Sequence, residues 1–321
     1  MVPSETSVLH QLPRFVTLAA VLCAALPVAS AQPSPTRQRG VLVREAIVYL
    51  APDAKSAKLG QAGRGREVAV LDHSREWVQG FITIGPGKDI TGWILNKGLV
   101  AAATPHGDRI LFGEAVDSEA EASRRGGRKG AAEDAMRLYY RTAEYFPNSP
   151  LAGEALYRAV DIRWQMDARD AKSRPSAKDD PRYRPHIEEE FVREVKKKFP
   201  DTKWAAMAEF LKIDNKLCGD WQGQSKCPEK ETEIYEDYVK EYPQSPKAPE
   251  ALYLAAWRQA ALIEIYKTES NPSRSTAARA RGIALAQRII SQHGESEYAL
   301  RAARLAFAME QQIPLYGNTV E

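Results

Sequence analysis

The stretches EYFPNSPLAGEALYRA (residues 144–159) and KEYPQSPKAPEALYLA (residues 240–255) are two versions of one pattern. Aligned from Phe146 and Tyr242, they share nine identities in fourteen positions. Internal similarity of this kind is the sequence signature of a repeated supersecondary unit. The fold of the chain therefore depends on which unit this pattern encodes.

Both copies contain a helix that is expected to end at a proline. Apolar or small residues precede each proline at the spacing of one helix face. These residues are Tyr139, Thr142, Ala143 and Phe146 in the first copy, and Tyr235, Tyr238, Val239 and Tyr242 in the second. Proline cannot continue a helix, so Pro147 and Pro243 are expected to end these two helices.

A second helix is expected to follow each proline after a short turn. Ser149-Pro150 and Ser245-Pro246 are expected to begin it, with serine as the N-cap and proline at the first helical position. Its inner stripe consists of small or apolar residues, Ala152, Ala155, Leu156 and Ala159. A connection of about three residues makes the two helices antiparallel, so the pattern predicts a helical hairpin.

Two weaker copies surround Pro200 and Gly294. The first has Val192, Val195, Phe199, Ala205, Ala208 and Phe210 at the corresponding positions; the second has Ala286, Ile289, Ile290, Ala299, Ala302 and Ala306. A single hairpin cannot bury its apolar stripe alone. Neighbouring hairpins are therefore expected to stack into a solenoid.

The repeats resemble the tetratricopeptide repeat family over about residues 135–310. Ala135, Tyr139, Thr142 and Pro147 match the spacing of that family's second helix, and Ala155 suits the small position of the next helix. The sequence pattern YP-x-SP-x-A-x-EALY is most similar to that of outer-membrane-assembly lipoproteins (BamD-like) and periplasmic cell-division coordinators. The chain departs from the family in its longer period and its insert ARDAKSRPSAKDDPRYRP (residues 168–185).

Residues 41–102 have the composition and residue pattern of a small β-domain. Short runs rich in β-branched and aromatic residues are separated by Gly, Pro, Asp and Ser, which predicts a strongly bent barrel. The segments EWVQGF, TGWI and VYLAPDAKSAKLGQAGRGREVAVL resemble the bacterial SH3 family. That resemblance implies binding of cell-wall peptide or of another protein. Tyr49 and Trp77 are the candidate contacts, with core packing as the equal alternative, and Trp93 is expected in the core.

The N-terminus has the features of an export signal. Arg14 precedes the apolar run FVTLAAVLCAALPVASA, and Ala29-Ser30-Ala31 supplies the cleavage pattern, so cleavage is expected between Ala31 and Gln32. The expected organisation is a signal peptide (1–31), a linker (32–40), an SH3-like barrel (41–102), a linker (103–113) and tetratricopeptide-like repeats (114–321). The protein is expected to be periplasmic or secreted.

Two cysteines, Cys218 and Cys227, remain after cleavage at that site. An even number of cysteines in an exported protein favours a disulfide. A zinc site is the weaker alternative, because four ligands are needed and no histidine lies nearby.

The sequence offers no motif for catalysis or for a cofactor. The patterns G-x-S-x-G, H-E-x-x-H and the phosphate-binding Gly-Lys-Ser/Thr are absent, and the five histidines are scattered. The formal net charge is only +3, so no electrostatic attraction to nucleic acid is implied. No segment after the signal is apolar enough to span a membrane. We therefore expect no catalytic residues, metal or cofactor.

The leading hypothesis is a non-enzymatic envelope adaptor. Its solenoid would bind an envelope protein, and its SH3-like domain would dock on the cell wall or a second protein. The alternatives are a peptidoglycan-binding accessory protein and an outer-membrane assembly factor. Six residues of the inner helices are candidate surface contacts, namely Arg158, Arg163, Gln165, Tyr253, Trp257 and Arg258. Packing between helices is the alternative for Tyr253 and Trp257.

Overall fold

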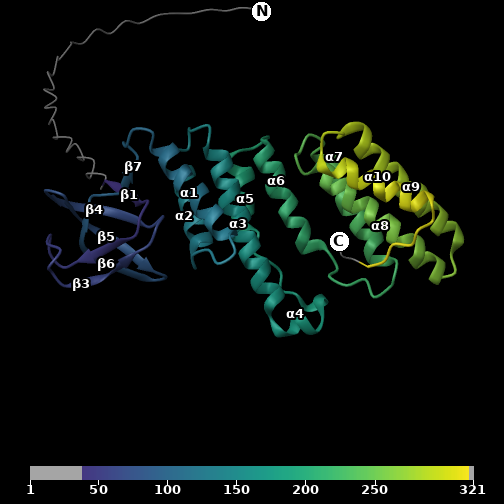
Figure 1. Ribbon diagram of the computed structural model, residues 1–321, viewed down its shortest axis with the longest axis horizontal. Helices are drawn as coiled ribbons and strands as arrows, with labels where there is room; N and C mark the ends of the chain where they lie inside the picture. Colours follow the sequence, from purple (N-terminus) through teal and green to yellow (C-terminus); the bar gives the residue numbers. More distant parts are fainter. Residues whose placement is uncertain (1–37, 318–321) are drawn as a thin grey trace, which may run out of the picture. The chain divides into compact units, whose positions relative to one another are not determined.

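The computed structural model describes residues 38–317, and the expected signal peptide and its cleavage site lie outside this part of the chain. Strands come first and helices follow (Figure 1). An all-β region followed by an all-α region is the layout that the sequence predicts. The first strand starts at Arg39, inside the range expected to be a linker.

The β region is one antiparallel sheet of seven strands in the order β3-β2-β6-β5-β4-β1-β7. The strands are β1 (Arg39–Leu42), β2 (Ala46–Tyr49), β3 (Lys58–Ala62), β4 (Glu67–Ser74), β5 (Trp77–Gly85), β6 (Lys88–Leu95) and β7 (Leu99–Ala101). Successive side chains of a strand point to opposite faces. In β5, for example, Val78 and Ile82 are fully buried, whereas Phe81 between them is exposed. The inward set, with Leu42, Val48, Val68 and Ile94, forms the core of the sheet.

The α region contains ten α-helices among the described residues. They are α1 (Gly107–Ser123), α2 (Ala131–Tyr145), α3 (Ala152–Ser173), α4 (Pro175–Asp179), α5 (Glu190–Lys198), α6 (Lys203–Leu211), α7 (Lys226–Glu241), α8 (Ala248–Thr268), α9 (Pro272–Gln292) and α10 (Glu297–Glu310). Two short 3₁₀ turns, η1 (Pro181–Tyr183) and η2 (Lys212–Lys216), lie in the connections. The insert at residues 168–185 accounts for the end of α3, α4 and η1.

Four helix connections have the same backbone geometry, and they are the four turns expected from the sequence. Phe146, Phe199, Tyr242 and His293 each follow a helix, with φ between −134° and −124° and ψ between 39° and 62°. Each also donates its N–H to the carbonyl four residues earlier. Because a residue before proline avoids the helical region, the first three stop the helix for the same steric reason.

A hydroxyl side chain stabilises each of these turns three residues further on. Ser149, Thr202, Ser245 and Ser296 accept a backbone N–H from Leu151, Ala205, Lys247 and Tyr298 at 3.1–3.3 Å. The prediction that Pro150 and Pro246 open the next helices is wrong, because α3 begins at Ala152 and α8 at Ala248. The two prolines lie within the turn, and the serines cap that turn.

The two helices that begin in the quoted stretches each pack against several neighbours, with small residues among their buried positions. Helix α3 packs against α2, α5 and α6, and α8 packs against α7, α9 and α10. Ala152 and Ala248, at equivalent positions of the two quoted stretches, are both completely buried. Tyr238 of α7 connects α6 to the turn before α8, since its hydroxyl donates to the Ala206 carbonyl at 2.9 Å and lies 2.6 Å from the Ser245 hydroxyl.

The sheet and the first helices share a continuous apolar core. Val41 and Val100, from β1 and β7, belong to the same buried cluster as Leu111 and Ala115 of α1. Residues 103–113 were expected to be a linker, but α1 begins within them, at Gly107. Cutting the chain near residue 110 would therefore divide a helix and expose this core.

The equivalence of the two repeats can be tested by overpacking. We expect Ala152→Leu and Ala248→Leu each to cost about 1–3 kcal/mol of unfolding free energy, because neither buried site has room for added methylenes. Ala280 of α9 is exposed, so Ala280→Leu is the matched control and should change stability by less than about 0.5 kcal/mol. Thermal unfolding of the three variants measures this, and tolerance at both buried sites would contradict the alignment.

Candidate functional site

A groove of about 500 Å³ lies where the β3–β4 loop meets the helices. Its wall on the sheet side is formed by Gly65, Arg66, Glu67 and Thr83, and its other walls come from α2, α3 and α5. Its volume is within the range of sites that hold small ligands or single side chains of a partner. We call it the β–α groove.

Gly65 fixes the distance between the loop and α2. Its φ of 71° lies in the left-handed region that glycine adopts without strain. A Cβ at this position would lie 2.5 Å from Cβ of Arg137, so no other residue fits without displacing the backbone. Arg137 in turn donates from Nε to the Arg64 carbonyl at 3.1 Å. Arg66 is therefore held against the side of α2.

The floor of the groove is apolar and adaptable. Met136, Val160 and Met166 line it together with Phe191, whose residue exposure is only 9%. Arg163 stacks on the Phe191 ring, with its guanidinium carbon 4.0 Å from the ring centroid. Methionine side chains adjust to irregular partners, so this floor suits an apolar side chain of variable shape.

Four arginines surround this floor, and three of them have partners within the protein. Arg137 is paired with Asp134, and Arg141 with Glu144. Arg163 has its Nε 3.7 Å from Asp167. Arg66 makes neither an ion pair nor a side-chain hydrogen bond within residues 38–317. Burial lowers the pKa of Arg66, and the charges of Arg137 and Arg141 lower it further against a smaller opposing effect of Asp134 and Asp89.

The carboxylates of the groove are already engaged. Burial alone would raise the pKa of Glu67, but hydrogen bonds from Tyr145 and Arg39, together with the Arg141 charge, hold it below its ordinary value. Glu194 lies 2.7 Å from the Lys198 ammonium. Among residues 38–317, Arg66 is therefore the groove arginine without an ion-pair partner.

The six candidate contacts of the inner helices differ in exposure. Arg163 lines the groove and its side chain is 48% exposed, and Gln165 is exposed on the same helix. Arg158 is committed inside the α region, since it donates to Glu119 at 3.1 Å and to the Tyr139 hydroxyl at 2.9 Å. Tyr253, Trp257 and Arg258 are 2%, 5% and 4% exposed, so these three are packing residues of α8 and are not surface contacts.

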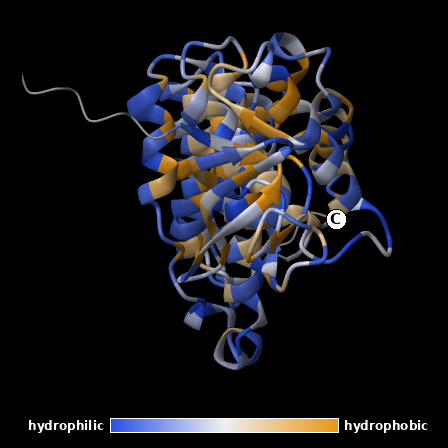
Figure 2. Ribbon diagram, turned by 90° about the vertical axis from the view of Figure 1, so that its left-hand side faces the viewer, coloured by the Kyte–Doolittle hydropathy of each residue, from blue (hydrophilic) through white to orange (hydrophobic). Residues whose placement is uncertain are grey.

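The aromatic candidates of the sheet lie together on one face. Trp93 is the cross-strand neighbour of both Tyr49 and Gln79, and Trp77 lies two residues before Gln79 on the same face. The Tyr49 ring meets the Trp77 ring edge-on, with centroids 5.4 Å apart. Trp77 is 7% exposed, whereas Tyr49 and Trp93 are half-buried. The sheet region also presents exposed apolar side chains, including Phe81 and Leu95. Hydrophobic and hydrophilic residues both occur along the ribbon of the molecule (Figure 2).

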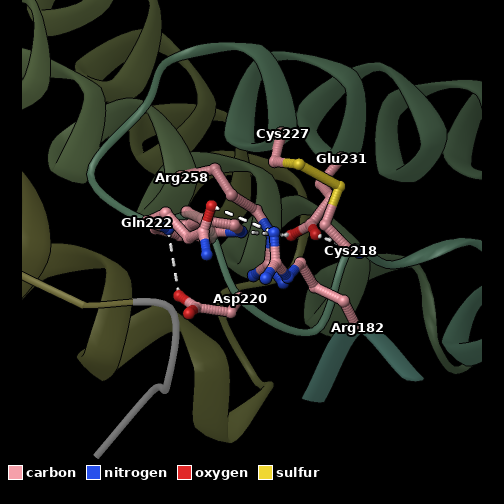
Figure 3. The surroundings of a disulfide bond; sticks show 8 residues. Arg182, Cys218, Asp220, Gln222, Cys227, Glu231 and Arg258 are labelled. Atoms are coloured by element: carbon pink, nitrogen blue, oxygen red, sulfur yellow. Dashed lines mark hydrogen bonds and ion pairs between the residues drawn. A yellow bond between two sulfur atoms is a disulfide. The ribbon is translucent and has the colours of Figure 1, made fainter. Parts of the chain in front are cut away.

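Cys218 and Cys227 form a disulfide, as the sequence predicts. The loop that the disulfide closes is anchored on a buried carboxylate (Figure 3). Glu231 accepts the Cys218 N–H at 2.8 Å, the Trp221 indole N–H at 3.1 Å and the Arg258 Nε–H at 3.0 Å. This ion pair is almost fully buried, with side-chain exposures of 5% for Arg258 and 2% for Glu231.

The disulfide is consistent with a periplasmic or secreted protein. From Gln38 to Gly317, no helix has both the length and the apolar character needed to cross a membrane. No cluster of three or more potential metal ligands is found over the same residues.

Sequence reasoning missed Arg66, Arg137 and Arg141. The segment GQAGRGRE (residues 60–67) reads as a glycine-containing turn, and that interpretation is correct for its backbone. The available signal was the spacing of Arg137, Tyr140 and Arg141, which places cations beside an aromatic ring on one helix face. Nothing in the sequence shows that the β3–β4 loop meets this face.

Comparisons with known proteins give no family for the chain. No protein-family model matches it, and no curated protein matches it. Among solved structures, a chain described as "DHF79 filament" is 18% identical, with 62% of this chain and 95% of that chain covered and a TM-score of 0.19. A TM-score this low carries no structural argument.

The Glu231–Arg258 pair should dominate local stability. We expect Glu231→Gln to cost about 3–5 kcal/mol of unfolding free energy, because it leaves Arg258 buried without a counter-charge. Glu233 is exposed on the same helix, and Glu233→Gln is the matched control with little expected effect. Chemical denaturation measures both. Adding Arg258→Met to Glu231→Gln should recover part of the loss, and no recovery would contradict the unpaired-charge explanation.

The disulfide should stabilise the same loop through chain entropy. Replacing both cysteines by serine is expected to cost roughly 2–3 kcal/mol in that model, since the bridge closes a short loop. Adding a reductant to the unaltered protein should give a similar loss in denaturation midpoint, while the double-serine variant should not respond to reductant. If the variant did respond, the reductant would be acting on something other than the Cys218–Cys227 disulfide, and the prediction would be contradicted.

Proposed function

We propose that this chain is a non-enzymatic adaptor of the cell envelope that binds a protein partner through its helical region. The observation that carries this proposal is the recurrence of one turn geometry at four helix connections. Repeated hairpins stack into extended surfaces, and proteins built in this way commonly use those surfaces to bind other proteins. The proposal includes the resemblance to tetratricopeptide repeats and their arrangement as a solenoid.

The β–α groove supplies a specific feature for such binding. It combines an apolar floor with arginine side chains, and both apolar anchors and arginine are enriched at protein interfaces. A standard interface needs about 800 Å² on each partner, so the groove would be the centre of a larger contact on the helices. In this proposal the partner is another envelope protein.

The sheet supports a second role, docking on peptidoglycan or on a second protein. Its aromatic face, with Tyr49, Trp77 and Trp93, and the exposed Phe81 and Leu95 are the supporting observation. Exposed apolar surface of this kind marks interaction sites. The SH3-like assignment of this region belongs to the same proposal. An outer-membrane assembly role rests on the sequence resemblance alone.

The adaptor function can be tested by site-specific photocrosslinking of the whole chain in cells. We expect benzoylphenylalanine at exposed helix positions, such as Tyr140 of α2 or Leu300 of α10, to give a discrete adduct with one envelope protein, identified by mass spectrometry. The same substitution at Lys55, in the exposed β2–β3 turn of the sheet region, tests the contribution of the sheet.

The wall-binding alternative makes a different prediction. The whole chain would sediment with purified peptidoglycan, and Phe81→Ser would reduce this without changing the unfolding temperature, because Phe81 is 48% exposed. Sedimentation with peptidoglycan, combined with no protein adduct at any helix position, would contradict the adaptor function and support the alternative.

A further inference from the structure

Arg66 is a cation that the fold holds in place without giving it a partner. The Gly65 backbone, with φ of 71°, and the bond from Arg137 to the Arg64 carbonyl fix the loop on both sides of the α2 contact. The side chain of Arg66 therefore lies in the wall of the β–α groove as a consequence of the packing of the loop. Within the described residues its guanidinium has no hydrogen-bond or ion-pair partner.

The charges around Arg66 make this position unfavourable without an added anion. Arg137 and Arg141 oppose its charge, and Asp134, which is paired with Arg137, and Asp89 offset only part of that effect. Partial burial removes water that would otherwise stabilise the cation. An anion entering the groove would relieve both effects at once.

The free capacity of the groove matches a single carboxylate. Arg137 and Arg141 are committed to internal carboxylates, and Arg163 lies over the Phe191 ring with its Nε 3.7 Å from Asp167. Among the described residues, Arg66 is therefore the groove arginine with no carboxylate within ion-pair distance, which leaves its guanidinium available for a bidentate contact. A phosphate dianion would need further donors, and the neighbouring Glu67, Asp167 and Glu194 oppose two negative charges more strongly than one. An isolated carboxylate requires one arginine only.

The apolar floor indicates what accompanies that carboxylate. Phe191 and the two methionines, Met136 and Met166, lie in the same groove as Arg66. These residues line a space of about 500 Å³, so their surface is available to an apolar side chain that enters it. A short acidic peptide segment offers an apolar side chain and a carboxylate close to each other.

We propose that the β–α groove binds an acidic segment of the partner protein, with a carboxylate on Arg66 and a neighbouring apolar side chain on the floor formed by Met166 and Phe191. The inference rests on the proposed adaptor function and names the chemistry of its partner. Arg163, stacked on Phe191, is placed to cover the apolar side chain from the open side of the groove.

A library of random nine-residue peptides, displayed and selected against the whole chain, provides the first test. Selected peptides should share Asp or Glu within two positions of Leu, Ile, Phe or Met. With the best synthetic peptide as the probe in fluorescence anisotropy, Arg66→Gln should weaken binding about tenfold or more, the expected loss for one charge-assisted contact. Met166→Ser should also weaken binding, and added salt should weaken it for the unaltered chain.

Two controls separate binding from folding. Arg44 is an exposed arginine of the β region with no ion pair in the described residues, and Arg44→Gln should leave peptide affinity unchanged. Arg66→Gln should keep or raise the unfolding temperature, because the variant loses no internal partner and removes a repelled charge. A structural arginine would instead lower it.

Several results would overturn the inference. These are selected peptides without acidic residues, unchanged affinity of Arg66→Gln, a lowered unfolding temperature of that variant, or displacement of the peptide by inorganic phosphate at equal concentration. Adducts from Leu300 but none from Tyr140 in the crosslinking experiment would also reject the groove while leaving the adaptor function standing. Absence of adducts at all helix positions would reject the adaptor function itself.

Discussion

The backbone at the residue before each turn is the constraint on which the α region depends. Phe146, Phe199 and Tyr242 precede proline, and the proline ring excludes the helical conformation there. The chain therefore leaves each helix in the same direction and, after a hydroxyl-capped turn, enters the next helix antiparallel to it. His293, which precedes Gly294, reaches a similar conformation without the proline. Since the exit direction repeats, equivalent alanines arrive at equivalent buried positions.

Close helix packing then determines where the sheet can attach. Small residues allow α1 and α2 to present a compact apolar face, and β1 and β7 continue the same core through Val41 and Val100. This attachment brings the β3–β4 loop to α2, where Gly65 removes the Cβ that would hold the two apart. The β–α groove is thus a consequence of joining a sheet to the first hairpin, and neither region would form it alone.

The sequence predicted the local features well because they depend on few residues. The helix ends before proline, the buried alanine stripe and the disulfide each depend on residues within about ten positions of one another. The start of α3 and α8 was misplaced because a serine-proline pair can cap a turn as well as a helix. Arg258 is not a surface contact, and for Tyr253 and Trp257 the packing alternative applies, because α8 packs against α7, α9 and α10 and is buried nearly all round. The amphipathic pattern of such a helix does not mark an exposed face. Arg258 is tolerated inside because Glu231, 27 positions earlier, meets it.

Arg66 and Arg258 have different roles in this protein, although both are partly or fully buried arginines. Arg258 is deeply buried, but it is satisfied by Glu231 and stacked on Tyr235, with its guanidinium carbon 4.8 Å from the ring centroid. It therefore stabilises the disulfide loop through Glu231, and its Nη1 donates to the Leu254 carbonyl at 3.2 Å. Arg66 is less buried, yet two neighbouring arginines oppose its charge, and within the described part of the chain it has no direct partner. Departures from internal consistency of this kind are expected where binding takes precedence over stability. In the proposed complex, a carboxylate supplies the direct partner that Arg66 lacks among the described residues, so a small contact area in the groove can favour acidic segments.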